Sequence, residues 1–236
     1  MLNNIVDKVY CINLKNRPKR LERSMQIFDE WSIDYSVWRG ICGVTDSVCL
    51  KMFNDNKVRF VNSGIRTEGS LGIYFTIINL IKHAKKNRYK RICIFEDDFL
   101  LSNNFNKDIE SIGNLIESFH MIYLGASQHD RGSLERLNNK FYYAKKTQGL
   151  FGVIISSSVF DRIVNLENNI YTAIDNAISK DIHRFRKSYV FLDNIVIADT
   201  SYSDTRKDFR DLKNHSIKMK WDLKKFSKSL MVRGIT

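Results

Sequence analysis

One stretch near the middle of the chain places three consecutive carboxylates directly after a run of apolar residues. The run covers residues 92–95, and the carboxylates are Glu96, Asp97 and Asp98. Four adjacent apolar residues indicate a strand that is buried on both faces, and such strands belong to sheets with helices on both sides. The pattern predicts an α/β fold with the carboxylates at the end of a central strand, where open α/β sheets bind ligands.

The three carboxylates suggest a cation site. Adjacent carboxylates repel one another and are costly to bury, so they are rarely placed at a sheet end for stability alone. Because side chains alternate along an extended chain, we expect Glu96 and Asp98 to point one way and Asp97 the other. At least one of the three carboxylates can then bind a hard divalent ion, and the remaining coordination positions of the ion stay open for a substrate diphosphate. The alternative is an acidic loop that caps the next helix or pairs with Lys and Arg.

The composition indicates one large domain and an anionic partner. With 43% hydrophobic and 12% aromatic residues, the 236-residue chain can fill a substantial core, and one Pro and 11 Gly leave no obvious linker. We expect a domain over residues 1–205 and a basic tail over 206–236 that packs on it or extends from it. The net charge of +12 fits nucleic acid, a membrane surface or a phosphorylated small molecule.

The pattern of the four cysteines indicates the redox state of the cellular compartment. Cys11, Cys42, Cys49 and Cys93 form no CxxC pair, so we expect buried free thiols and a reducing, cytoplasmic environment. No stretch of about 18 apolar residues occurs, so we expect no transmembrane segment, although peripheral membrane contact stays open.

Hydrophobic periodicity predicts alternating strands and helices. A helix beginning at Pro18 is expected to bury Leu21, Met25, Phe28 and Trp31, and residues 44–68 are expected to be an irregular insertion with a short helix over 47–53. The expected strands are 8–14, 35–38, 92–95, 121–124, 141–144 and 152–155, with a last strand pair at 190–192 and 195–198. The other expected helices are 69–88, 109–116, 159–164 and 172–183, and residues 128–140 are expected to form a surface loop.

Basic and glycine-containing turns follow the first two strands. Asn13 and Leu14 lead into a helix start with Arg17 and Arg20, where N–H groups and cationic side chains can meet an anion. The turn at Arg39 and Gly40 is expected to lie beside this loop. Gly69 and Gly72 would let the start of the next long helix approach a ligand closely. A solvated basic helix start and a plain turn are the alternatives.

Four stretches together resemble glycosyltransferase family 25, the group that contains lipooligosaccharide and collagen galactosyltransferases. They are residues 9–14 with Arg17 and Arg20, residues 69–72, residues 96–98 and residues 149–156. The resemblance implies a GT-A-like (Rossmann-like) α/β fold with a mixed, mainly parallel sheet. It also implies a UDP-sugar donor, with galactose or glucose as the sugar, and Mn²⁺ or Mg²⁺.

The chain departs from the family pattern at two places. Ser70 replaces the usual acid after the first glycine, and Thr76-Ile77 stands where Ser-His is common. These changes affect the expected contacts with the sugar, so the resemblance does not determine which sugar is bound. Asp175 falls near the family's Ile-Asp element, and residues 203–205 fall near its late Ser-Asp-Ile.

The resemblance suggests roles for particular side chains. Asp98, with Asp97, would hold the metal beside the diphosphate, and His215 is a candidate for a further ligand from the C-terminal part. Asp175 is the candidate general base for an inverting transfer to a hydroxyl group of a glycan, glycolipid or glycoprotein. A helix-start Asp and an exposed tail His are the structural alternatives.

Three rival functions remain open on the sequence. A basic nucleic-acid-binding protein fits the charge, but no helix-turn-helix, zinc-finger or RNA-recognition signature occurs, so we expect no nucleic-acid partner. A metal nuclease would gather carboxylates from separated segments rather than three in a row. A non-catalytic nucleotide-sugar-binding module fits the departures at Ser70 and Ile77.

Overall fold

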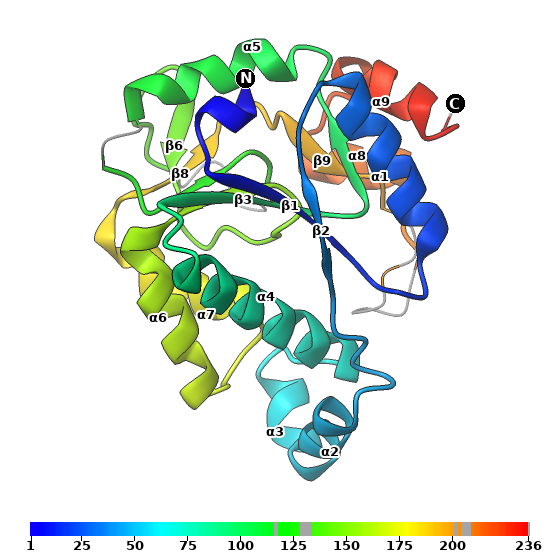
Figure 1. Cartoon of the computed structure of the whole chain (residues 1–236), viewed down its shortest axis with the longest axis vertical. Helices are drawn as coiled ribbons and strands as arrows, with labels where there is room; N and C mark the ends of the chain where they lie inside the picture. The colour runs from blue at the N-terminus through cyan, green and yellow to red at the C-terminus, as the bar shows by residue number, and fades with distance from the viewer. Residues whose placement is uncertain (116–117, 128–133, 201–202, 204–208, 236) are drawn as a thin grey trace.

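A seven-stranded mixed sheet crosses the centre of the molecule, with helices on both faces (Figure 1). The computed structural model describes residues 1–115, 118–127, 134–200, 203 and 209–235. In spatial order the strands are β2 (Ser36–Arg39), β1 (Lys8–Asn13), β3 (Arg91–Glu96), β7 (Val153–Ser156), β5 (Met121–Tyr123), β8 (Ser188–Phe191) and β6 (Phe141–Tyr143). Only β7 and β6 run against the other five strands, so the predicted fold class is confirmed.

The central strand β3 shows why helices are needed on both sides of the sheet. Ile92 and Ile94 belong to one apolar core, and Cys93 and Phe95 belong to a second core on the opposite face. All four side chains have no solvent exposure. Each face therefore has to be covered by its own layer of helices.

The helices divide between these two layers, as Figure 1 shows. The first layer contains α4 (Glu68–Lys86), α6 (Phe160–Asn165) and α7 (Ile174–Ile182), with α2 (Ser47–Asp55) and α3 (Lys57–Asn62) beyond α4. The second contains α1 (Pro18–Glu30), α5 (Phe105–Glu110), α8 (Leu212–Met219) and α9 (Ser227–Val232). Short 3-10 turns are η1 (Leu2–Asn4), η2 (Ser111–Leu115), η4 (Ser157–Val159), η5 (Leu166–Asn168), η6 (His183–Phe185) and η7 (Leu223–Phe226).

The predicted last strand pair is wrong. β9 (Val196–Ala198) does not pair with β8 but forms a separate two-stranded antiparallel sheet with β4 (Phe99–Leu101), a strand that the sequence analysis did not predict. β8 instead pairs with β5 and β6. Each of these short apolar segments satisfies a strand pattern, and the pattern does not say which segment lies beside which.

Two further expectations need correction. Within residues 44–68, the expected short helix over 47–53 is confirmed as α2, but a second helix, α3, was not predicted. Phe60 is the only buried side chain of α3, so no apolar stripe indicated this helix. In α1, Met25 is 42% exposed, whereas Ser24, Ile27 and Phe28 are buried. The buried face of α1 includes Ser24, and a prediction based on apolar residues alone does not include a serine. Of the expected loop over 128–140, residues 128–133 lie outside the described residues.

The C-terminal residues pack on the second layer. α9 contacts both α1 and β4.

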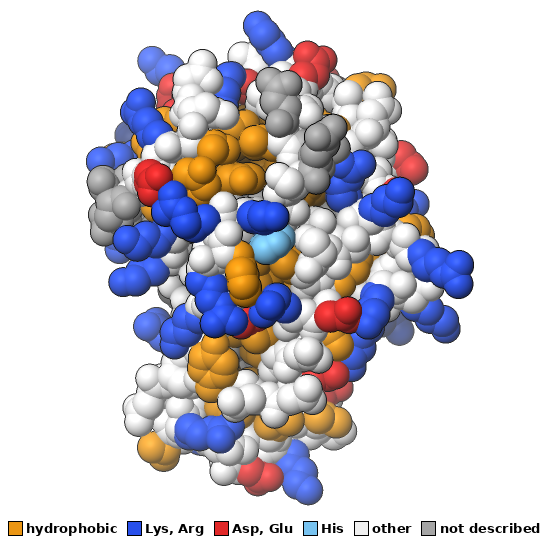
Figure 2. Space-filling view, turned by 90° about the vertical axis from the view of Figure 1, so that its left-hand side faces the viewer, with side chains coloured by type: hydrophobic (Ala, Val, Ile, Leu, Met, Phe, Trp, Pro, Cys, Tyr) orange, Lys and Arg blue, Asp and Glu red, His pale blue; other side chains and the backbone are white. Residues whose placement is uncertain are grey.

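Among the described residues, no helix combines the length and the apolar character needed to cross a bilayer. Lys and Arg side chains are spread over the face shown in Figure 2, as the net charge of +12 leads one to expect.

Candidate functional site

The three carboxylates lie where β3 ends and turns into β4. Glu96 is the last residue of β3, and Asp97 and Asp98 form the turn. One guanidinium nitrogen of Arg20, Nη2, lies 2.6 Å from Asp97 Oδ1 and 3.2 Å from Asp98 Oδ2. The expectation that Asp98 and Asp97 point to opposite sides is therefore wrong, because strand alternation stops at Glu96.

A chain of polar contacts connects the ends of the three neighbouring parallel strands. Arg39, at the end of β2, donates from Nη1 to Asn13 Oδ1 at 2.6 Å. Asn13, at the end of β1, donates from Nδ2 to Asp97 Oδ2 at 2.6 Å. Both oxygens of Asp97 thus contact protein groups, Asn13 on one side and Arg20 on the other. The carboxyl edge of the sheet is held as one unit.

The three carboxylates lie close together at a largely buried turn, and their charges affect one another. Burial raises the pKa of Glu96 to about 8, with the charges of Asp98, Asp97 and Asp175 adding to the rise and Arg20 opposing it. Burial also raises the pKa of Asp97 to about 6, although Arg20 lowers it. An additional cation at this turn would therefore stabilise the ionised carboxylates.

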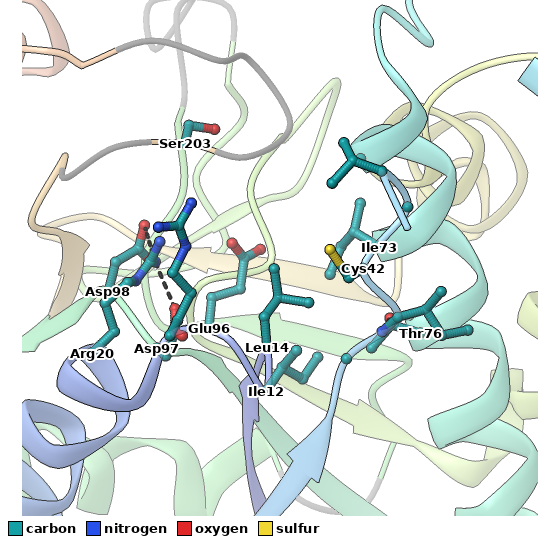
Figure 3. Close-up of a pocket in the computed structure, with 16 residues that line it drawn as sticks. Ile12, Leu14, Arg20, Cys42, Ile73, Thr76, Glu96, Asp97, Asp98 and Ser203 are labelled. Carbon is teal, nitrogen blue, oxygen red and sulfur yellow. Dashed lines mark hydrogen bonds and ion pairs between the residues drawn. The ribbon is translucent and has the colours of Figure 1, made fainter. Parts of the chain in front are cut away.

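A pocket opens directly in front of the acidic turn. Figure 3 shows Asp97 and Asp98 beside Arg20 on one side, Cys42, Ile73 and Thr76 on the other, and Glu96 and Leu14 between them. Of the residues singled out from the sequence, those that line it are Leu14, Arg17, Arg20, Gly40, Gly69, Glu96, Asp97 and Asp98. The pocket therefore has a charged half and an apolar half.

The apolar half is shaped by close contact between the turn after β2 and the start of α4. A Cβ on Gly72 would lie 2.5 Å from the carbonyl oxygen of Ile41, and one on Gly43 would lie 2.0 Å from that of Glu68. Thr76 Oγ1 accepts a hydrogen bond from the Ile41 N–H at 2.8 Å. Gly72 is thus required for backbone packing, and it does not line the pocket.

Asp175 comes from a distant part of the chain, and its charge still acts on the acidic turn. It sits in the first turn of α7, and its charge contributes to the raised pKa of Glu96. Burial raises the pKa of Asp175, and backbone N–H groups of Asn176 and Gly149 oppose the rise. It does not line the described pocket.

The other predicted metal ligand, His215, lies in α8 against the ring of Trp221, with ring centroids 5.1 Å apart. Within the described part of the chain, no three His, Cys, Asp or Glu side chains are arranged to hold a metal. Asp97, Asp98 and His215 therefore do not form a three-ligand site here. Glu96 and Asp98 both line the pocket, and Mg²⁺-type ions commonly take one or two carboxylates and complete their shell with water and phosphate.

Sequence reasoning missed several residues at the site. Those that line the pocket are Ile12, Ile41, Cys42, Gly43, Val44 and Ile73. Thr76 and Ser203, which fall in stretches that the sequence analysis compared with the family pattern, line it as well. Asp204 and Thr205, beside Ser203, lie outside the described residues. Behind the turn, Ser24 Oγ donates to the carbonyl oxygen of Asp97 at 2.9 Å, and Arg233 donates to the same oxygen at 3.1 Å. Neither residue carries a local motif that could have indicated this contact.

The fold and the site define an α/β protein that presents an acidic turn and an arginine beside a pocket at the carboxyl edge of its sheet. The model of glycosyltransferase family 25 (LPS biosynthesis protein) matches residues 6–150, which is more than half of the chain. The chain belongs to this family.

Individual relatives are distant. The chain is 27% identical to procollagen galactosyltransferase 1-A of Xenopus laevis over 129 residues, 50% of this chain and 21% of that protein. It is 26% identical to the inactive glycosyltransferase 25 family member 3 of Homo sapiens over 140 residues, 52% of this chain and 22% of that protein. The matched part is thus about a fifth of these relatives' length.

Among solved structures, a glycosyltransferase involved in the glycosylation of the major capsid of PBCV-1 aligns with a TM-score of 0.43 and 8% identity. The alignment covers 90% of this chain and 98% of that one.

Proposed function

We propose that this protein transfers a hexose, galactose or glucose, from a UDP-sugar to a hydroxyl group of a glycan, glycolipid or glycoprotein, with Mn²⁺ or Mg²⁺ as cofactor. The observation that carries the proposal is the acidic turn with Arg20 in front of a pocket, in a chain of glycosyltransferase family 25. The reaction joins the acceptor oxygen to the anomeric carbon, breaks the bond from that carbon to the diphosphate, and releases one proton.

The two halves of the pocket suit the two ends of the donor. The apolar half, with Gly40, Ile41 and Ile73, offers a surface for the flat uracil ring. The charged half, with Arg17 and Arg20, places positive charge beside the diphosphate. This orientation puts the sugar beyond the acidic turn.

Glu96 and Asp98 would hold the divalent ion with their carboxylate oxygens. When bound, the ion neutralises the negative charge that develops on the diphosphate leaving group. Asp97 has both oxygens in contact with Asn13 and Arg20. We therefore assign Asp97 the role of positioning Arg20 rather than that of a metal ligand.

Asp175 is the proposed general base. Its charge adds to the raised pKa of Glu96, and this electrostatic coupling to the acidic turn supports the role. Burial raises its pKa toward the range in which a carboxylate accepts a proton effectively at neutral pH. It would take the proton of the acceptor hydroxyl as the oxygen attacks the face of the sugar opposite the diphosphate, which inverts the configuration.

The free cysteines support a reducing compartment, and we propose the cytoplasm. Cys11, Cys42, Cys49 and Cys93 are all free, and all but Cys42 are buried.

The direct test is a screen of UDP- and GDP-sugars for slow hydrolysis, with Mn²⁺ and with chelator, using Glu96→Gln as the inactive control. We expect release of UDP from UDP-galactose or UDP-glucose only with Mn²⁺ and only from the parent protein. Equal release with chelator, or from Glu96→Gln, would contradict the proposal.

A second candidate is a non-catalytic nucleotide-sugar-binding module. It is favoured by the 26% identity to a family member named as inactive. This alternative predicts UDP-sugar binding that depends on Mn²⁺, together with the absence of hydrolysis or transfer for every sugar in the screen.

A further inference from the structure

One edge of β4 is covered by side chains of α9 and of Arg233, the residue that follows α9. β4 pairs with β9 on its other edge, where the Asp199 N–H donates to the Asp98 carbonyl at 2.7 Å. Because backbone carbonyls alternate along an extended chain, those of Phe99 and Leu101 face away from β9. The carbonyl of Asp97, in the turn before β4, accepts hydrogen bonds from Ser24 and Arg233. These buried groups need partners of their own.

Two residues of the C-terminal segment supply those partners. Ser229 Oγ donates to the Leu101 carbonyl at 2.8 Å and accepts from the Leu101 N–H at 3.0 Å. Arg233 Nη2 donates to the carbonyls of Phe99 at 2.9 Å and Asp97 at 3.1 Å. Ser229 therefore holds the far end of β4, and Arg233 holds the end that carries the acidic turn.

Arg233 is itself fixed in place. Its Nη1 lies 3.0 Å from Asp199 Oδ2, and both side chains are almost fully buried, with 0% and 2% exposed. The planar guanidinium can serve the carboxylate and two carbonyls at once, which the single ammonium of a lysine cannot do with the same geometry. A buried, doubly held group of this kind has little freedom to move.

We propose that Arg233 is a positioning residue that sets the geometry of the Glu96–Asp98 turn for the cation and the diphosphate. The proposal rests on the function proposed above. Arg233 lies outside the residues matched by the family model, so the C-terminal segment would contribute to ligand binding without touching the ligand. Groups that orient metal ligands from behind commonly change affinity when they are altered.

The experiment compares Arg233→Lys with Ser229→Ala, which removes hydrogen bonds from the same strand edge two residues farther from the acidic turn. The affinity for UDP in the presence of Mn²⁺ is measured by calorimetry, and stability by thermal unfolding. Removal of outer-shell contacts costs about 10- to 100-fold in metal affinity. We expect a loss of that size for Arg233→Lys and less than about twofold for Ser229→Ala, even where both lower Tm.

Amide hydrogen exchange of the ligand-free proteins gives a readout that does not depend on the proposed function. Arg233→Lys should speed exchange at Asp199, whose N–H donates to Asp98, whereas Ser229→Ala should speed exchange at Leu101 alone. If the Arg233→Lys variant does not fold, the double variant Asp199→Asn/Arg233→Met is measured in its place, because it removes both buried charges together.

Equal UDP affinities in Arg233→Lys and Ser229→Ala would overturn the proposal. An unchanged exchange rate at the Asp199 amide would overturn the proposal as well. This test still applies if the parent protein binds no UDP and the proposed function itself is wrong.

Discussion

At the scale of single residues, the acidic turn brings Glu96, Asp97 and Asp98 close together, and Arg20 contacts both Asp97 and Asp98. Asp98 is the largest charge contribution to the raised pKa of Glu96, and it also contacts Arg20. Replacing it removes a ligand candidate and relieves repulsion at the same time. Function and stability should therefore respond differently to its loss.

The variant Asp98→Asn tests this separation. We expect turnover to fall by about 10²-fold or more, the scale on which loss of a charge-stabilising group acts. Tm should stay within about 2 °C of the parent value, because relief of like-charge repulsion offsets the lost contact with Arg20. A Tm loss of many degrees with normal turnover would instead make the turn a structural element.

A second residue-scale prediction concerns His183, which lies in the core with its Nε2 3.1 Å from the hydroxyl of Tyr123. Burial lowers the pKa of His183 to about 4. The unfolded chain therefore takes up a proton near pH 6.5, and the folded protein does so only near pH 4. The contribution of His183 to the free energy of unfolding is fully present above pH 6.5. It decreases by about 3 kcal/mol as the pH falls from 6.5 to 4.

The control for this prediction is His183→Gln, which keeps a hydrogen-bond acceptor for Tyr123 but does not titrate. Denaturant unfolding from pH 7 to pH 4 should show a smaller loss of stability in the variant, and comparison with the parent cancels the effect of other groups. Identical pH profiles would show that His183 is protonated normally in the folded protein.

At the scale of elements, the pocket depends on how closely the turn after β2 approaches α4. In Gly72→Ala the new methyl group would lie 2.5 Å from the Ile41 carbonyl oxygen and 2.8 Å from the Gly43 nitrogen, so backbone has to move. We expect a loss of about 1–3 kcal/mol in the free energy of unfolding. The matched control is Gly113→Ala, where no atom lies within 4 Å of the added group. A neutral Gly72→Ala would show that the turn is free to shift.

The start of α7 carries the prediction on the general base. Asp175→Asn preserves shape and removes only the proton acceptor, so UDP and Mn²⁺ affinity should remain near the parent value. Turnover should fall by roughly 10²-fold or more. Steady-state kinetics and calorimetry separate the two effects. Normal turnover would remove Asp175 from the mechanism, and loss of donor binding would place it in the sugar pocket.

At the scale of the whole molecule, the sequence predicted features that repeat along the chain. The apolar run of β3 and the periodic helices gave the α/β class, and the end of β3 placed Glu96, Asp97 and Asp98 beside the pocket. The predicted basic loop after β1 supplies Arg17 and Arg20 to the same pocket. Each of these inferences depends on residues close together in the chain, which a sequence pattern can represent.

What the sequence could not predict depends on contacts between distant segments. The pairing of β4 with β9 joins residues about a hundred positions apart, and either strand could have had another neighbour. Ser24 and Arg233 reach the Asp97 carbonyl from α1 and from beyond α9, and no local pattern marks them. Turn geometry at Asp97 and Asp98 likewise overrode the alternation expected for a strand.

The central claim is that the acidic turn and the pocket bind a nucleotide diphosphate together with a divalent cation. Calorimetric titration of the parent protein with UDP, once in millimolar Mn²⁺ and once in chelator, tests it directly. Without the cation, the diphosphate meets the negative charge of the acidic turn, so we predict binding at least about tenfold weaker in chelator. Equal UDP affinity under the two conditions would contradict the account.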